Sequence, residues 1–367
     1  MKNLIAKKLN KEERKAAIQK REFYNGRSLL GYDWAIFLFT LGGREAGKSY
    51  FFTDFFVRQF IQKGRPFYWM RLTDRSQRKL LMNNAEKLVD PDLRRKYNLD
   101  LVTSGENVYQ VTRRSKPDKN GKTKILEKKL MARVMCLSTF YNDKGSGLFD
   151  KDFLSDPNMY YNICLDEMQR EKNEKNTFDI VYAFVNQIEN IIRSTKTRVR
   201  IVCIGNTLEE ASDLLCSFNF IPEKFGRFKI RKKRAVIENI EPTEAYKERR
   251  KGTVADILLP NASNFTNKIE TDNALITKKR LIKPQYLIKF SKDPDDNFVV
   301  WDGDVITKYH NQKLKQVIAM RPYLDELFNI KVRNAIFEQF DSRGFKFRDL
   351  ITFKQFQKQL ELLRPNR

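Results

Sequence analysis

The chain has 367 residues, with 71 Lys or Arg against 46 Asp or Glu and a formal net charge of +25. This length allows two or three domains, and the positive charge predicts a polyanionic partner such as nucleic acid. The single histidine argues against a His-based metal cluster and against a Ser/His/Asp triad. No apolar stretch approaches the roughly 20 residues that a membrane span needs, and no signal peptide is visible, so we expect a soluble, intracellular protein without a membrane partner.

The basic charge is spread along the chain. Residues 1–223 hold 40 basic and 28 acidic residues, and residues 224–367 hold 31 and 18. This distribution fits a protein that meets nucleic acid along several surfaces better than one with a basic tail. The four cysteines show no CxxC spacing, and we expect buried thiols in a reducing compartment. They are Cys136, Cys164, Cys203 and Cys216.

Residues 1–30, with nine basic and three acidic residues, predict a helical arm, which could also be a lid over a nucleotide. Residues 34–49 then read WAIFLFTLGGREAGKS, an apolar strand that runs into Gly42-x-x-x-x-Gly47-Lys48-Ser49. Glycines let backbone N–H groups turn toward a phosphate, the lysine reaches its oxygens, and the serine ligates Mg²⁺ at the start of a helix. We predict a phosphate-binding loop with nucleotide contacts from Gly42, Gly43, Arg44, Glu45, Ala46, Gly47, Lys48, Ser49 and Tyr50.

Between residues 34 and 240, apolar segments alternate with amphipathic ones. The apolar segments are 34–41, 66–72, 131–138, 160–165 and 199–204. This alternation predicts an α/β domain with a mostly parallel sheet flanked by helices. Residues 107–129 read as a hairpin around the turn sequence PDKNG.

The apolar segment at 160–165 ends in Asp166 and Glu167. Asp166 can hold Mg²⁺ together with Ser49, and Glu167 can polarise the attacking water. An adjacent glutamate is characteristic of additional-strand ATPases, whereas GTPases position water differently. We therefore predict ATP and Mg²⁺ as cofactors and Lys48 and Glu167 as catalytic residues; two acidic residues that merely cap a strand are the alternative.

The segment 199–204 is followed by Gly205 and Asn206, and a polar residue at this strand end can contact the γ-phosphate or the lytic water. An ordinary Gly-Asn turn would look the same. Upstream lie Arg193, Arg198 and Arg200. ATPase rings often use an arginine of one subunit at the γ-phosphate of the next. We assign Arg193 to this role, although a basic helix end also complements the helix dipole.

After residue 225 the sequence changes character. Residues 227–240 predict one last strand with basic flanks, and 241–252 a short charged helix. We expect an ATPase domain over 1–240, a linker over 241–274 and a smaller α+β domain over 275–367. In the last, 274–290 and 297–309 read as strands around a loop, followed by two amphipathic helices.

The ordered set GGREAGKSY, CLDE, IIRSTKTRVRIVCIGN, FNFIPEKFGRF and YKERRKG resembles the DNA-packaging ATPases of φ29-like bacteriophages, from residue 34 to residue 301. The resemblance implies a terminase-like motor, a homomeric ring and probable pentamer, that drives double-stranded DNA into a capsid through the portal. It also implies a structural prohead RNA as partner, and a place in the host cell cytoplasm with transient attachment to the procapsid. Arg193 would act in trans. Because the arginine segment is one residue longer here, Arg198 is the alternative.

The family's C-terminal domain looks like an RNase H type nuclease fold that has lost its catalytic acids. Here Asp302 and Asp304 flank Gly303, and residues 293–296 form an Asp-rich turn. No acidic set is spaced over separate strands to hold two metals. We therefore expect a vestigial domain that binds nucleic acid or the portal. An active metal-dependent nuclease, a helicase that uses the same ATP site and a non-enzymatic adaptor are the alternatives.

DNA contacts should be mainly electrostatic, since a packaging motor must move any sequence. Lys144, in the polar loop YNDKGSG, and the 113–129 hairpin are the candidates. Both could equally be solvated loops.

Overall fold

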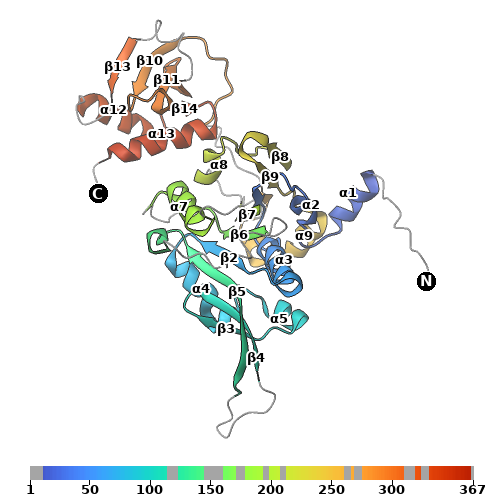
Figure 1. The fold of residues 1–367 in the computed structure, drawn as a ribbon. Helices are drawn as coiled ribbons and strands as arrows, with labels where there is room; N and C mark the ends of the chain where they lie inside the picture. The colour runs from blue at the N-terminus through green and yellow to red at the C-terminus, as the bar shows by residue number, and fades with distance from the viewer. Residues whose placement is uncertain are drawn as a thin grey trace. The chain divides into compact units, whose positions relative to one another are not determined.

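The computed structural model describes residues 11–113, 123–143, 160–170, 178–192, 198–206, 212–259, 266–267, 275–309, 319–323 and 330–364. The chain divides into two compact units, shown in Figure 1. The first comprises Met1–Leu208 and Pro222–Lys268, and the second Glu209–Ile221 and Ile269–Arg367. Within the described ranges, no helix has the length and apolar character needed to cross a membrane.

The first unit is built on a nine-stranded sheet in the order β3-β4-β5-β2-β6-β7-β1-β9-β8. Its strands are β1 Phe37–Leu41, β2 Phe67–Arg71, β3 Leu101–Ser104, β4 Asn107–Arg113, β5 Ile125–Cys136, β6 Tyr160–Asp166, β7 Arg198–Gly205, β8 Gly226–Ile230 and β9 Ala235–Asn239. All pairs from β5 across to β9 are parallel, whereas β3, β4 and β8 pair antiparallel at the two edges. The predicted mostly parallel α/β sheet is confirmed. One further strand, β7, lies between β1 and β6, which is the additional-strand order.

The first unit also contains helices. They are α1 Lys11–Gln19, α2 Arg27–Leu30, α3 Lys48–Lys63, α4 Asp74–Ala85, α5 Pro91–Tyr97, α7 Ile180–Ile192, α9 Glu244–Arg250 and α10 Val254–Leu258, with 3₁₀ turns at Phe140–Asp143 and Arg231–Lys233. Helix α3 buries an apolar stripe, because Phe52, Phe56 and Phe60 recur every four residues and all lie inside the core. The Phe56 ring lies 5.4 Å from that of Phe67 on β2. Such a ring accounts for about 3–5 kcal/mol when truncated to alanine, so this packing fixes α3 on the sheet.

The segment 227–240 corrects one prediction. It is a hairpin of β8 and β9 rather than a single strand, with the reversal at Arg234, whose φ is 48°. A left-handed arginine is uncommon and carries no strong sequence signal. The predicted helix at 241–252 is α9, and the predicted hairpin at 107–129 is confirmed by the antiparallel pairing of β4 with β5.

The second unit holds a five-stranded mixed sheet in the order β13-β10-β11-β12-β14. Its elements are α8 Asp213–Ser217, β10 Pro284–Lys289, a 3₁₀ turn at Pro294–Asp296, β11 Asn297–Trp301, β12 Val305–Lys308, β13 Ala319–Tyr323, α12 Ile330–Asp341, β14 Lys346–Phe347 and α13 Leu350–Leu363. Phe298, Phe347 and Phe356 form the centre of its core. The expected α+β composition is present, and an RNase H type fold stays a prediction.

Two details of the second unit differ from expectation. Residues 297–309 form two strands rather than one, because Asp302 and Gly303 both have positive φ, 49° and 97°, and turn the chain back. In 274–290, strand β10 begins only at Pro284. The four cysteines are free and buried, as expected.

Candidate active site

The loop after β1 has the conformation that the sequence predicts for phosphate binding. Strand β1 ends at Leu41, and α3 begins at Lys48 behind Gly47, whose φ is 83°. Glu45 is also left-handed, with φ 60°. A side chain on Gly47 would be strained by this φ and would meet the Phe23 ring at 3.2 Å. The loop therefore wraps around the amino end of α3, where free backbone N–H groups and the helix dipole favour an anion.

Lys48 lies folded inside this loop. Its ammonium donates to the carbonyl oxygens of Gly42 at 2.8 Å and Gly43 at 2.7 Å, and to Asn206 Oδ1 at 3.3 Å. Burial lowers the pKa of this ammonium to about 8, and the nearby Asp166 opposes that shift. Asn206, predicted from its place after β7, is thus in contact with the loop lysine.

Ser49 and Asp166 meet across the gap between α3 and β6. The Ser49 hydroxyl donates to Asp166 Oδ1 at 2.9 Å. Neighbouring corners of an octahedron of oxygen ligands at about 2.0–2.1 Å lie about 2.9 Å apart, so this hydroxyl–carboxylate pair suits Mg²⁺. Burial raises the pKa of the Asp166 carboxyl, and Arg71 counters that rise.

Arg71, the last residue of β2, is a site residue that the motifs did not reveal. Its guanidinium donates to Asp166 Oδ2 at 2.8 Å and forms an ion pair with Glu167 Oε2. Strands β2 and β6 are parallel neighbours, with Met70 opposite Leu165, so the next residue of each lies at the same sheet edge. One cation thus holds both carboxylates of the Asp-Glu pair.

Glu167 itself lies at the rim. Its φ is 57°, its backbone N–H donates to Asp166 Oδ1 at 3.1 Å, and its side chain is 59% exposed. The turn at this residue directs the chain out of the sheet directly after the buried Asp166. A solvent-facing carboxylate one residue beyond a buried one is suited to act on water.

A cavity of about 570 Å³ joins these groups, lined by residues 44–50, Asp166, Glu167 and Asn206. The predicted loop residues from Arg44 to Tyr50 therefore face one space with the predicted carboxylates. Gly42 and Gly43 contribute the carbonyls that hold Lys48.

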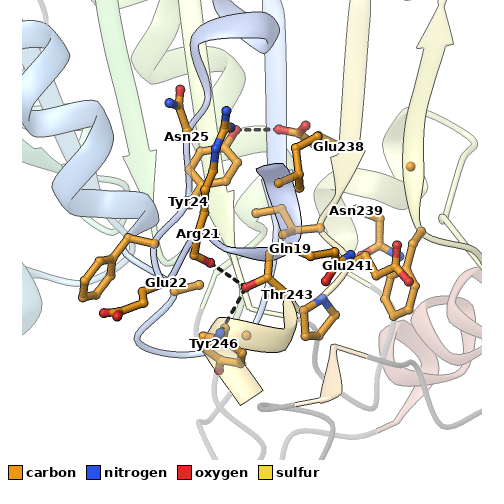
Figure 2. Close-up of a pocket in the computed structure, with 18 of the residues that line it drawn as sticks. Gln19, Arg21, Glu22, Tyr24, Asn25, Glu238, Asn239, Glu241, Thr243 and Tyr246 are labelled. Atoms are coloured by element: carbon orange, nitrogen blue, oxygen red, sulfur yellow. Dashed lines mark hydrogen bonds between the residues drawn. The ribbon is translucent and has the colours of Figure 1, made fainter. Parts of the chain in front are cut away.

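A second cavity, of about 350 Å³, is lined in part by Gly43 and Ala46 of the same loop. Figure 2 shows its walls, which come from residues 18–28, β9 and the start of α9. Tyr24 donates to Glu238 Oε2 at 2.5 Å, and Thr243 donates to the Arg21 carbonyl at 2.6 Å. Ala46 lines both cavities, so they adjoin at the loop.

Helix α9, which the sequence placed in a linker, holds the phosphate loop from outside. Tyr246 Oη donates to the Arg44 carbonyl at 2.7 Å, and Arg249 donates to the Glu45 carbonyl at 2.7 Å. Arg250 also donates to the Glu45 carboxylate at 2.7 Å. These contacts fix the two loop residues that precede Ala46, and no local spacing in the sequence indicates them.

The arginines upstream of β7 have different settings. Arg193 lies outside the described residues, so its trans role stays a prediction, as does that of Arg198. Arg198 begins β7, at the sheet edge opposite to the phosphate loop, where it donates to Tyr160 Oη at 3.3 Å. Arg200 lies over the same tyrosine ring, 4.3 Å from its centroid, and packs as part of the strand. Lys144 and His310 also lie outside the described residues.

The acidic residues of the second unit are engaged with their own neighbours. Both oxygens of Asp302 accept backbone N–H groups, from Ile282 at 3.1 Å and Lys283 at 2.9 Å, and Asp304 pairs with Lys346 at 3.5 Å. In the described part of the chain, no group of three or more His, Cys, Asp or Glu side chains could hold a metal. Asp302 thus has a structural part in its turn.

Comparison with known proteins decides the family. The model of the family "Podovirus DNA encapsidation protein (Gp16)" matches residues 95–339, more than half of the chain. The chain belongs to this family. The predicted resemblance is therefore confirmed, and the chain is a bacteriophage DNA-packaging protein.

Relatives of this encapsidation protein include the DNA packaging proteins of Bacillus phages phi29 and PZA. Each is 26% identical over 270 residues, which is 72% of this chain and 70% of the relative. In structure, the encapsidation protein is similar to a chain of the phi29 viral genome packaging motor assembly, with a TM-score of 0.60 and 20% identity over 94% of this chain and 100% of that one. It is also similar to a chain of the Phi-28 gp11 DNA packaging motor, with a TM-score of 0.56 and 16% identity over 94% of this chain and 100% of that one. These two structures share its fold.

Proposed function

We propose that this encapsidation protein is the ATP-hydrolysing subunit of a motor that moves double-stranded DNA into a phage capsid. The observation that carries the proposal is the meeting of Lys48 and Ser49 with Asp166 and Glu167 around one cavity, in a sheet of additional-strand order. A loop lysine, a hydroxyl and two carboxylates, the side-chain types that these roles need, line this one cavity.

The residues divide the work as follows. Lys48 leaves the loop carbonyls for the β and γ oxygens of ATP. Ser49 and Asp166 hold Mg²⁺, which supplies charge neutralisation on the phosphates when it is bound. Glu167 orients and deprotonates the attacking water. Asn206, which already contacts Lys48, contacts the γ-phosphate.

Arg71 donates to Asp166 and forms an ion pair with Glu167 through one guanidinium. A carboxylate engaged in this way is a poor acceptor for a proton from water. We infer that Glu167 acts as base only after it parts from Arg71, so that Arg71 positions the glutamate between turnovers.

The cavity between residues 18–28, β9 and α9 is placed to take the nucleoside. It adjoins the phosphate site at Ala46 and combines apolar walls with a few polar groups, as base-binding cavities do. The nucleotide would then lie across the loop, with its base on one side and its phosphates on the other.

Assembly is the second part of the proposal. We infer a homomeric ring, a pentamer, on the portal, with a prohead RNA as a further partner. The similar chain of the phi29 viral genome packaging motor assembly supports assembly with other packaging components. Such a motor would act in the host cytoplasm while attached to the procapsid. Arg193 of one subunit would complete the site of the next. The second unit would bind nucleic acid or the portal; because Asp302 is occupied by backbone donors, a nuclease role is not favoured.

The test is the DNA-stimulated ATPase of Glu167→Gln, which keeps the shape of the side chain and removes the base. We expect turnover to fall about 10²–10⁴-fold with ATP binding retained, whereas Lys48→Ala loses binding itself. Glu189→Gln, an exposed glutamate on α7, is the matched control and keeps wild-type turnover. Normal turnover in Glu167→Gln contradicts the assignment. Mixed rings of Glu167→Gln and Arg193→Ala subunits should regain activity; no recovery at any ratio rejects the trans arginine.

A further inference from the structure

The β4–β5 hairpin extends beyond the sheet to which it belongs. Strand β5 pairs with β2 only over 132–136, and β3 pairs with β4 only as far as Gln110. Residues 112–113 and 125–128 therefore pair only within the β4–β5 hairpin. Figure 1 shows this two-stranded ribbon projecting from the body of the first unit.

Both faces of the ribbon are open to solvent. Residues 124–129 are all exposed, although alternate residues of a strand point to opposite faces. Leu126, at 63% exposed, is one of them. A two-stranded hairpin with no covered face is marginally stable in water, so its own packing does not explain why the chain extends so far.

The ribbon is strongly basic. The described residues 112–113 and 123–129 include four Lys or Arg and one Glu. Arg113 pairs with Asp100 at 2.6 Å, Lys129 with Glu127 at 3.0 Å, and Lys128 lies 3.9 Å from the centroid of the Tyr109 ring. Exposed pairs of this kind are weak, about 0–1 kcal/mol, and leave the cations available to a stronger anion.

Lys124 has a different setting. It is exposed and takes part in no hydrogen bond or ion pair within the described ranges. Together with Arg113, Lys128 and Lys129, it places cations along a narrow projecting element. The partner must therefore be an extended anion into which a two-stranded ribbon fits.

We propose that the β4–β5 ribbon is a DNA-binding arm that contacts the phosphates bordering a major groove of the packaged duplex. The choice of DNA as cargo rests on the proposed function. The major groove of B-form DNA, about 12 Å wide, admits a two-stranded β-ribbon. The major groove of an A-form RNA duplex is too narrow and deep for it. Lysine contacts to phosphate are independent of sequence, as a packaging protein requires.

The experiment measures binding of a labelled DNA duplex to the full chain without nucleotide, by fluorescence anisotropy from 50 to 300 mM salt. Each phosphate contact contributes about 0.9 to the slope of log K against log salt. Lys124→Gln/Lys128→Gln should lower the slope by about 1.8 and, at 0.15 M salt, weaken binding about 30-fold. Lys124→Gln alone should lower the slope by about 0.9. The matched control is Lys79→Gln/Lys87→Gln, two exposed lysines on and just after α4, which should leave the slope unchanged.

Four outcomes overturn the proposal. The first is a slope that stays at the wild-type value in both Lys124 variants, and the second is a slope that falls equally in the control pair. The third is a loss of RNA-duplex binding as large as the loss of DNA binding, which rejects the groove argument. The fourth is a loss of self-association while single subunits still bind DNA, which assigns the ribbon to a neighbouring copy. The ATPase is assayed separately: an inactive wild type would reject the proposed motor and leave the binding result intact.

Discussion

Replacing Arg71 by methionine removes the cation shared by Asp166 and Glu167 while keeping an unbranched side chain of similar length. The side chains of Arg71 and Asp166 are only 12% and 4% exposed, and breaking a buried pair from one side costs about 3–5 kcal/mol. The Glu167 side chain is 59% exposed, so the Arg71–Glu167 ion pair contributes only about 0–1 kcal/mol to the free energy of unfolding. Because Ser49 still donates to Asp166, we expect a loss of about 3 kcal/mol for the first unit.

Chemical unfolding of the nucleotide-free protein, followed by far-UV circular dichroism, measures this loss. Asp166→Asn removes the anion, and the double variant Arg71→Met/Asp166→Asn removes both. If the pair is the cause, the double variant loses less than the sum of the two single ones by about 2–3 kcal/mol. Additive losses would refute the coupling.

The pH dependence supplies an independent check. Burial already raises the pKa of Asp166, and Arg71 opposes the rise, so Arg71→Met should raise that pKa further. An acid with a raised folded-state pKa lowers stability above that pKa, and the loss is recovered as pH falls and the group binds a proton. The deficit of Arg71→Met should therefore shrink between pH 7.5 and pH 5.5. A deficit that grows over this range contradicts the reasoning.

The parts of the site that the sequence predicts are those that local spacing encodes. In the phosphate loop, the glycines and Lys48 follow one another directly, and the Asp166–Glu167 pair ends a single apolar strand. Because parallel strands end at one sheet edge, carboxylates and loop could be expected to meet before the strand order was known. The contact of Lys48 with Asn206 follows from the same rule.

Arg71 and α9 depend on strand order and on long-range packing, which spacing does not encode. Arg71 reaches the carboxylates only because β2 is the neighbour of β6, and an arginine at the end of an apolar strand is otherwise unremarkable. Tyr246 and Arg249 contact loop residues about 200 positions earlier in the chain. Their charged helix looks like any solvated segment until its partner is known.

The two misread hairpins differ in what the sequence offered. Asp302-Gly303 between two apolar runs is a hairpin signal that favours positive φ at both positions, and it could have divided 297–309 correctly. Arg234, in contrast, adopts a left-handed conformation without any such signal. The reversal there allows β8 to pair antiparallel with β9 at the sheet edge, while β9 pairs parallel with β1.

Two further predictions concern the nucleotide. Ser28→Trp should fill the second cavity from its wall. Calorimetry should then show ATP binding weakened at least tenfold (~1.4 kcal/mol), with the affinity for inorganic tripolyphosphate unchanged. Equal losses for both ligands would place the base elsewhere. Lys48 should make ATP binding depend on pH. Burial lowers its pKa to about 8 in the free protein, and bound phosphates favour the ammonium, so above pH 8 the amine must take up a proton on binding. ATP affinity should therefore fall with rising pH, by up to about tenfold per unit, while staying level below pH 7.5. Lys48→Arg, which remains charged, should show no such fall, and a level wild-type affinity up to pH 9.5 would contradict the buried, half-charged lysine.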